Sequence, residues 1–195
     1  MSVPIEQVKQ LREQIGASIM DCKKALEDAR GDQAKAMALL EARSKTIATK
    51  KQGRILGAGL VHSYIHGNQR VGVLLELWCE TDFVAKNDKF QQLAHDLALH
   101  IAALRPEYLS RADVPEAYVK SQTKLFIEET AKEKKPAAVK KKIAEGKLEK
   151  FLSERCLLSQ PFVKDPSKTV AALLEQYTAT IGERLAVGRF VRFEV

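Results

Sequence analysis

The clearest structural period in this sequence lies in residues 71–79, Val-Gly-Val-Leu-Leu-Glu-Leu-Trp-Cys. Alternate residues are apolar, and alternate side chains of a β-strand lie on the same face. A second run of strand-forming residues occupies 55–66, and Gly67, Asn68 and Gln69 supply a turn between the two runs. The pattern predicts an antiparallel hairpin with one buried face. On its second strand this face is formed by Val71, Val73, Leu75, Leu77 and Cys79.

The segments that follow the hairpin predict mainly helices. An apolar stripe with helical spacing predicts a long helix from Asn87 or Asp88 to Pro106. Helices are also expected from Pro115 to about Glu133 and from Pro136 onward. We expect Gly146 to divide the second of these into two helices, and we expect no coiled-coil insertion.

The C-terminal part of the chain predicts a loop over 159–166, a helix over about 167–181 and a final strand over 189–195. Val191, Phe193 and Val195 would share one face of that strand. The predicted core, 55–195, therefore combines packed helices with a three-stranded antiparallel sheet, which places the protein in the α+β class.

The N-terminal segment has a different pattern. Apolar stripes, with Gly16 and Gly31 as stop signals, predict three short helices that form a bundle over residues 1–43. Residues 44–54 are polar and basic without a clear stripe, and we interpret them as a linker. A three-helix bundle of this size has a small core, so we expect it to lean on the rest of the chain or on a partner.

The chain carries 32 Lys and Arg against 25 Asp and Glu, a net charge of +7. This excess allows an acidic protein partner or a nucleic acid and does not choose between them. Glu133, Glu145 and Glu149 interrupt its most basic stretch, which is typical of a solvated helix face, with an RNA-binding surface as the alternative. The lysines of that stretch are Lys132, Lys134, Lys135, Lys140, Lys141, Lys142, Lys147 and Lys150.

No motif in the sequence indicates an enzyme. There is no phosphate-binding glycine loop, no nucleophile elbow and no cluster of His and Cys at metal-ligand spacing. We therefore expect no catalytic residue, metal or cofactor. No run approaches the roughly 18 apolar residues that span a membrane. No secretory signal is visible, so we expect a cytoplasmic protein without membrane contact.

The corner between the second strand and the long helix reads Cys-Glu-Thr-Asp-Phe-Val-Ala-Lys-Asn-Asp over 79–88. Loops at such positions often carry function. In one interpretation Asp82 caps a local turn and Phe83 packs into the core. In the other both side chains project and form an aromatic anchor with a charged neighbour, as in many interface hot spots. The residues by themselves favour the first interpretation.

Several separated blocks resemble the elongation factor Ts family, whose members are nucleotide exchange factors for elongation factor Tu. The most diagnostic block is Glu-Thr-Asp-Phe-Val-Ala-Lys-Asn at 80–87, and residues 20–26, 160–165 and 189–195 match in the same order. The family's usual Thr-Gly-Ala-Gly-Met-Met stretch is Ile-Gly-Ala-Ser-Ile-Met at 15–20 here.

The resemblance implies a ubiquitin-associated-like bundle and a protein that acts by binding, not as an enzyme. It implies that the Asp82–Phe83 pair, with Thr81 and Val84 beside it, enters elongation factor Tu next to its Mg²⁺ site. It also implies bundle contacts to the nucleotide-binding domain, a homodimer as in short family members, and no direct nucleic-acid binding. The bundle contacts fall on Arg12, Ile19 and Met20, although the two apolar residues could instead belong to the bundle core.

Overall fold

The computed structural model of the chain describes residues 3–132 and 134–195. It divides into two compact units, Met1–Leu99 with Ala171–Val195 and His100–Val170. The boundaries expected from the sequence for the bundle, linker and core stay a prediction.

The N-terminal segment of the first unit forms the expected three helices, α1 (Ile5–Ile15), α2 (Ile19–Asp28) and α3 (Gln33–Lys51). Gly16 closes α1 in the left-handed region, with φ of 68°. α3 continues through most of the predicted linker, so residues 44–51 are helical. The bundle core is small and consists of Val8, Leu11, Ile15, Cys22, Ala25, Leu26, Ala29, Ala36 and Leu40.

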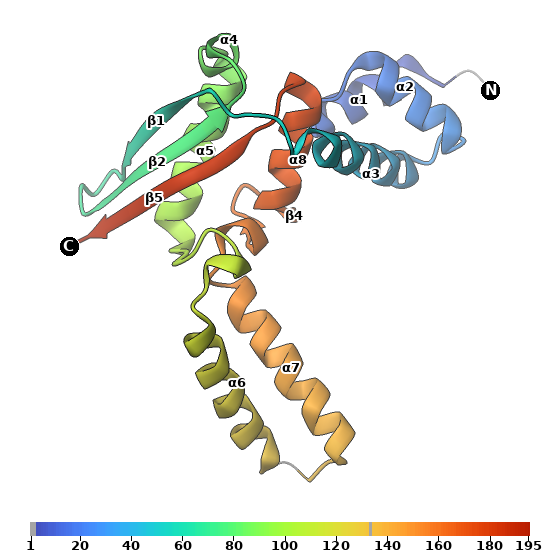
Figure 1. Cartoon of the computed structure of the whole chain (residues 1–195). Coiled ribbons are helices and arrows are strands. Elements are labelled where there is room, and N and C mark those ends of the chain that lie inside the picture. Colours follow the sequence, from blue (N-terminus) through green and yellow to red (C-terminus); the bar gives the residue numbers. More distant parts are fainter. Residues whose placement is uncertain (1–2, 133) are drawn as a thin grey trace. The chain divides into compact units, whose positions relative to one another are not determined.

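The sheet has three antiparallel strands in the order β1–β2–β5 (Figure 1). The strands are β1 (Ala58–Ile65), β2 (Val71–Cys79) and β5 (Ala186–Glu194). Leu77 pairs with Leu60 of β1, and Leu74 pairs with Val191 of β5. Of the five side chains that the alternation predicted to be buried on β2, Val73, Leu75, Leu77 and Cys79 are buried and Val71 is half-buried. The predicted α+β class with its three-stranded sheet is thus confirmed.

Helix α5 (Asp88–Leu104) lies against one face of the sheet (Figure 1). Phe90, Leu93 and Leu97 of its predicted stripe are fully buried. The ring of His95 meets the ring of His62 on β1 edge-on, with 5.4 Å between centroids. Burial and the facing His95 lower the pKa of His62.

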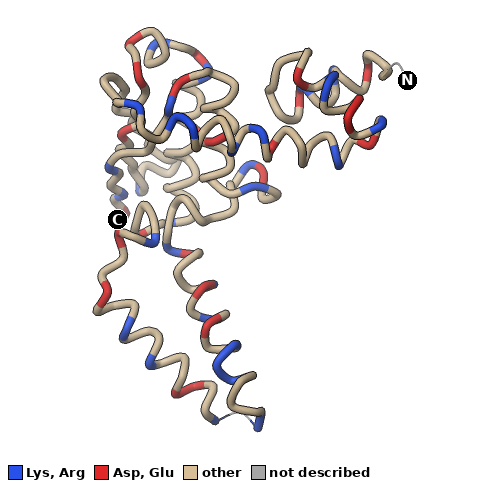
Figure 2. The backbone as a smooth tube through the Cα atoms, turned by 45° about the vertical axis from the view of Figure 1, so that its right-hand side comes forward, with Lys and Arg blue, Asp and Glu red and all other residues tan. Residues whose placement is uncertain are grey.

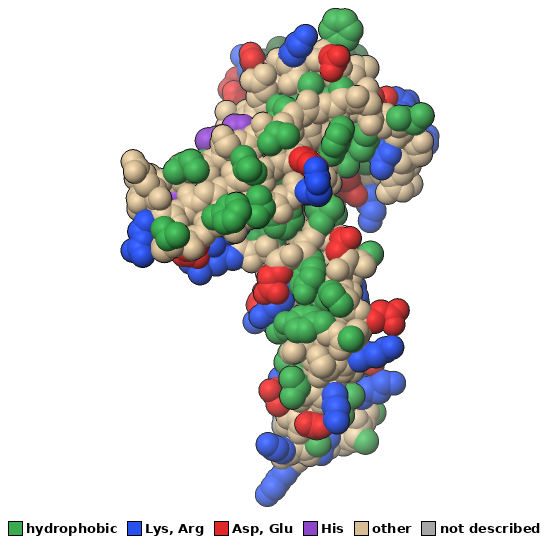
Figure 3. Space-filling view, turned by 60° about the vertical axis from the view of Figure 1, so that its left-hand side comes forward, with side chains coloured by type: hydrophobic (Ala, Val, Ile, Leu, Met, Phe, Trp, Pro, Cys, Tyr) green, Lys and Arg blue, Asp and Glu red, His purple; other side chains and the backbone are tan. Residues whose placement is uncertain are grey.

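The opposite face of the sheet stays exposed and is largely apolar. Figure 3 shows hydrophobic side chains spread over this part of the surface. The large exposed ones on this face of the three strands are Val61, Ile65, Leu74, Trp78, Val191 and Phe193. An apolar face of this kind is typical of an interaction surface.

Helix α8 (Val170–Ile181) precedes β5 and lies near both α1 and α5. Its Gln176 side chain donates a hydrogen bond to the carbonyl of Ile15 at the end of α1. Burial and the nearby charge of Asp96 on α5 raise the pKa of Tyr177. α8 therefore touches both the bundle and the helix that covers the sheet.

The second unit contains an antiparallel helical hairpin of α6 (Glu116–Ala131) and α7 (Ala137–Ser153), shown in Figure 1. The Phe151 ring of α7 packs against Phe126 and Tyr118 of α6, with centroids 5.6 and 6.0 Å apart. The sequence predicted both helices, but the expected absence of a coiled-coil insertion is wrong. Glu133, the expected end of the first helix, lies outside the described residues.

Two local predictions in this unit are wrong. α7 runs unbroken through Gly146, because packing against α6 outweighs the roughly 1 kcal/mol that a single glycine costs a helix. A small two-stranded ribbon, β3 (Pro161–Phe162) and β4 (Asp165–Thr169), begins in the predicted loop at 159–166 and extends beyond its end. Its β4 strand takes up the first residues of the helix expected from 167, so α8 begins only at Val170.

A buried polar cluster stabilises the base of the hairpin. The fully buried His100 accepts a hydrogen bond on Nδ1 from the Val163 amide, at 3.1 Å. Its Nε2 therefore carries the proton and donates to Oε1 of Gln160, at 2.9 Å. The Gln160 amide nitrogen donates in turn to the Glu154 carbonyl, at 2.6 Å. Burial lowers the pKa of His100, so the folded chain favours its neutral form.

Candidate functional site

The corner after β2 exposes the aromatic side chain singled out in the sequence. Thr81 precedes α4 (Asp82–Ala85), a single helical turn. Phe83 is 89% exposed, so the interpretation in which it packs into the core is wrong. Asp82 and Thr81 are exposed as well, and Val84 is half-buried. The four predicted residues of this site therefore form one projecting turn.

The strand end beneath this turn is firmly buried. Cys79 is fully buried, and its Sγ donates a hydrogen bond to the Thr81 carbonyl, at 3.2 Å. Burial, followed by the charge of Glu183, raises the pKa of the Cys79 thiol to about 11. The thiol is thus protonated at neutral pH and serves packing, not nucleophilic chemistry.

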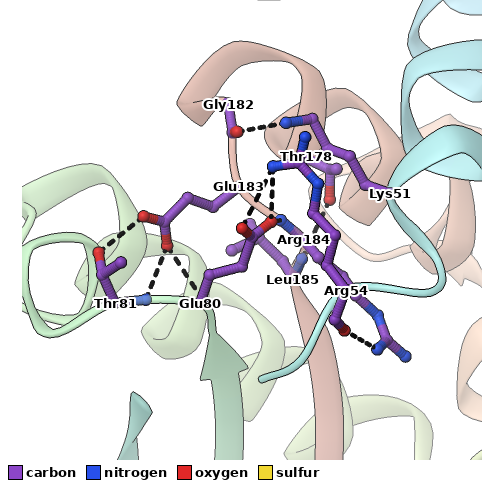
Figure 4. A network of polar contacts seen from close by, with 9 residues as sticks. All are labelled: Lys51, Arg54, Glu80, Thr81, Thr178, Gly182, Glu183, Arg184 and Leu185. Atoms are coloured by element: carbon purple, nitrogen blue, oxygen red, sulfur yellow. Dashed lines mark hydrogen bonds and ion pairs between the residues drawn. The ribbon is translucent and has the colours of Figure 1, made fainter. Parts of the chain in front are cut away.

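A carboxylate from the far end of the chain holds the corner backbone, as Figure 4 shows. Oε2 of Glu183 accepts hydrogen bonds from the amides of Glu80 and Thr81, both at 3.0 Å. Its Oε1 accepts from the Thr81 hydroxyl, at 2.6 Å. The turn between α8 and β5 therefore fixes the start of α4.

Glu80 makes the reciprocal contact and adds a third segment. Its carboxylate accepts from the Arg184 amide, at 2.6 Å, and from the Arg54 guanidinium, at 3.2 and 3.3 Å. These contacts, above all the one from the Arg184 amide, lower the pKa of Glu80. Lys51, at the end of α3, donates to the carbonyl of Gly182. The network thus joins the corner, the segment after α3 and the turn before β5 (Figure 4).

The bundle residues of the second predicted set line one hollow. A pocket of about 740 Å³ is lined by Arg12, Ile19 and Met20, together with Lys89 of α5 and Thr180 of α8. Ile19 is 54% and Met20 73% exposed, so both stay outside the bundle core. The interpretation that assigns them to that core is wrong. No role was predicted for Lys89 from the sequence. This residue at the start of α5 adds a positive charge to the same hollow.

The polar network was missed at the sequence level. Glu183 follows Gly182, whose φ of 86° marks it as a helix-ending glycine, and that local signal was available. The partners of Glu183 are more than 100 residues away in the chain, and no periodicity reports such a distance.

Four of the eight lysines in the basic stretch make contacts within the hairpin. Lys147 pairs with Glu129 across the two helices, at 3.1 Å, and Lys140 donates to the Ala131 carbonyl, at 2.7 Å. Lys141 and Lys150 pair with acidic residues of their own helix. Figure 2 shows basic and acidic residues following one another along both helices. This arrangement favours the solvated-face interpretation over an RNA surface.

Within residues 3–132 and 134–195, no three His, Cys, Asp or Glu side chains gather in a way that could hold a metal ion. His62 and His95 form a pair, with 3.3 Å between Nε2 and Nδ1. None of the helices in the same described residues has the length and apolar character needed to cross a membrane.

The chain matches the family model described as "Elongation factor TS" over residues 6–195. It is 50% identical over 190 residues to "Elongation factor Ts" of Carboxydothermus hydrogenoformans, covering 97% of this chain and 88% of that protein. It is also 50% identical over 188 residues to "Elongation factor Ts" of Moorella thermoacetica, covering 96% of this chain and 93% of that protein.

Proposed function

The chain belongs to the elongation factor Ts family of translation elongation factors, and we propose on that premise that it is a guanine nucleotide exchange factor. Its partner is the GTPase elongation factor Tu. It binds the GDP form, disturbs the Mg²⁺ and phosphate site and promotes GDP release so that GTP can bind. The protein acts in the cytoplasm by protein–protein binding, without covalent chemistry, cofactor, membrane contact or direct nucleic-acid binding.

The thermodynamics of exchange sets what such a factor must do. A GTPase holds GDP through its phosphates and Mg²⁺. A factor that bound the GDP form and the nucleotide-free form equally would shift nothing, however tight its binding. It must therefore favour the nucleotide-free form, and by reciprocity incoming GTP weakens its hold.

The projecting turn supplies the groups for that preference. Phe83 is the apolar wedge that enters between helices of the GTPase, and Asp82 disturbs the groups that hold Mg²⁺. Thr81 and Val84 flank the pair and complete the contact. The observation that carries the proposal is the 89% exposure of Phe83 on a backbone held by Glu183. Buried anchors of interfaces are commonly aromatic side chains of this kind.

The bundle supplies a second contact in this proposal. Arg12, Ile19 and Met20 dock on the nucleotide-binding domain of the GTPase, where the exposed apolar pair provides affinity and Arg12 a charge. Their common position around one hollow supports a single docking surface. This surface brings the GTPase to the projecting turn without itself acting on the nucleotide.

We further propose that two copies of the chain associate through the exposed face of the sheet. Val61, Leu74 and Phe193 leave this face apolar, and a second copy of the same face would bury it. The Phe193→Glu variant should shift the mass measured by analytical ultracentrifugation from dimer to monomer, because a carboxylate would be buried without a partner. A wild-type chain that sediments as a monomer at micromolar concentration would refute the dimer.

The function itself is tested by release of a fluorescent GDP analogue from elongation factor Tu in the presence of Mg²⁺. With excess unlabelled GTP present, the protein at one tenth of the GTPase concentration should accelerate release of the whole bound pool, because incoming GTP frees each molecule to act again. An unchanged release rate at equimolar protein would refute the proposal.

A further inference from the structure

We infer that Glu183 is a positioning residue for exchange: its carboxylate holds the backbone from which Asp82 and Phe83 project. The inference rests on the proposed function, because it assigns a task to a residue that does not itself belong to the projecting turn. The carboxylate lies at the turn between α8 and β5, about 100 positions further along the chain.

Glu183 accepts hydrogen bonds from backbone amides of the corner that have no partner in the sheet. The amides of Glu80 and Thr81 come directly after β2, beyond its last paired residue, Cys79. Backbone amides left without a strand partner require another acceptor. Oε2 of Glu183 takes both amides at 3.0 Å, and charged acceptors make the stronger hydrogen bonds.

The Thr81 hydroxyl also donates a hydrogen bond to the Glu183 carboxylate. Thr81 occupies the N-cap position of α4, where a threonine side chain ordinarily accepts a hydrogen bond from the first turn. Here its side chain makes no such cap and instead donates to Oε1 of Glu183, at 2.6 Å. Thr81 is thus attached to Glu183 through both its backbone and its side chain.

The turn that carries Glu183 is itself well fixed. Gly182 ends α8 with φ of 86° and donates its amide to the Thr178 carbonyl, at 3.0 Å. The buried Thr178 hydroxyl accepts from the Leu185 amide, at 3.3 Å. Glu183 therefore stands between two contacts to a buried residue of α8, and it can hold the corner without moving with it.

Glu80 strengthens the attachment in the opposite direction. Its carboxylate accepts from the Arg184 amide while Glu183 accepts from the Glu80 amide, so each segment binds the backbone of the other. Arg54 adds the segment after α3 through its guanidinium on Glu80. Figure 4 shows how these contacts converge on the first residues of the corner.

A fixed corner serves the proposed mechanism because ordering a mobile loop during binding costs free energy. Without Glu183 the turn would have to be ordered at the moment when Phe83 enters the GTPase. The loss should appear in the maximal rate of GDP release. The concentration that gives half of this rate should change little, because the bundle contacts remain.

The experiment compares Glu183→Ala and Glu183→Gln with the wild type, with Glu145→Ala on the exposed part of α7 as the matched control. We expect Glu183→Ala to lower the maximal release rate roughly tenfold, since a displaced group can cost one to two orders of magnitude. Glu183→Gln keeps one acceptor oxygen and should fall between Glu183→Ala and the wild type. Glu145→Ala should match the wild type.

Combined variants separate positioning from a general structural role. If Glu183 acts through the projecting turn, Glu183→Ala should lower the rate in the wild-type background, lower it less once Phe83→Ala is present, and add nothing once Asp82→Ala and Phe83→Ala are both present. Equal falls in all three backgrounds would overturn the inference, and so would a Glu183→Ala protein with the wild-type rate.

Amide hydrogen exchange provides a readout that does not depend on the GTPase. Glu183→Ala and Thr81→Val should speed exchange over residues 80–84, while protection of β2 at Leu75 and Leu77 stays as in the wild type. Unchanged protection at 80–84 would overturn the inference. A wild type that fails to release GDP would instead refute the proposed function, so the two failures are distinguishable. If Glu183→Ala does not fold, Glu183→Gln and Thr81→Val answer the same questions.

Discussion

The corner at 80–84 and the hairpin of α6 and α7 are stabilised in opposite ways. In the corner, carboxylates bind backbone amides and leave an aromatic side chain exposed. In the hairpin, aromatic rings pack between the helices and the charged residues pair on the surface. Charge content is therefore a poor guide to the candidate site, because four of the eight lysines in the lysine-rich stretch make contacts within the hairpin. The better guide is an apolar side chain that a rigid backbone keeps exposed.

Removing the exposed ring should have the largest effect on function. We expect Phe83→Ala to lower the maximal rate of GDP release about 30-fold, which corresponds to the roughly 2 kcal/mol of an interface hot spot. Its free energy of unfolding should stay within about 0.5 kcal/mol of the wild type, because the ring is exposed. Leu125→Ala, which removes a half-exposed apolar side chain from α6, is the matched control and should leave release unchanged. A wild-type release rate in the Phe83→Ala variant would contradict a functional role for the exposed ring. The corner would then differ from the hairpin in structure only.

The charge beside the ring should matter only while Mg²⁺ is present. Asp82→Asn keeps the shape of the side chain and removes its charge, so we expect a loss of about tenfold in the release rate with Mg²⁺, a typical cost for one interfacial charge. When a chelator removes Mg²⁺, the variant and the wild type should give the same rate. A defect of equal size with and without Mg²⁺ would show that Asp82 acts on something other than the metal site.

The bundle surface should affect affinity and leave the maximal rate unchanged. Met20→Ala and Arg12→Ala should each raise the half-saturating concentration of the factor about fivefold, as expected for interface contacts worth roughly 1 kcal/mol. Glu6→Ala, on α1 but outside the pocket, serves as the control. A fall in the maximal rate with unchanged half-saturation would contradict the assignment of these residues to docking.

The smallest expected effect concerns the pH dependence of stability and comes from the buried His100 at the base of the hairpin. The pKa of His100 is lowered on folding, so the stabilisation from its neutral form is full above the unfolded value of about 6.5. That stabilisation should be lost progressively as the pH falls below 6.5 toward the folded pKa. Thermal unfolding between pH 8 and pH 5 should show this decline, and His100→Gln should weaken it. His62, whose pKa is also lowered, contributes with the same sign. An identical pH profile in His100→Gln would exclude His100 as the cause.

Much of the fold was predictable from local periodicity. The alternation at 71–79 identified β2 and its buried face, and the stripe from Phe90 to Leu97 identified the buried face of α5. The break at Gly146 failed because packing against α6 holds the helix together there. The strands β3 and β4 were missed because they are too short to show a period.

The geometry of the candidate site could not be predicted from the sequence. The block from Thr81 to Val84 and the bundle set were named from a resemblance, while the residues alone favoured a buried Phe83. Its actual exposure depends on how the corner leaves the sheet, and that path is set by Glu183 and Arg184. These contacts join positions more than 100 residues apart, which local patterns do not report.

Local patterns in the sequence were enough to locate most of the strands and helices, because an alternation or a helical stripe is a property of neighbouring residues. The sequence also determined the family, since matched blocks are spread over nearly the whole chain. Three features depend on the three-dimensional packing: the exposure of Phe83, the pairing of α6 with α7, and the hydrogen bonds from the corner to Glu183. Burial and hydrogen bonding depend on which distant segments come into contact. Such contacts produce no periodic pattern in the sequence.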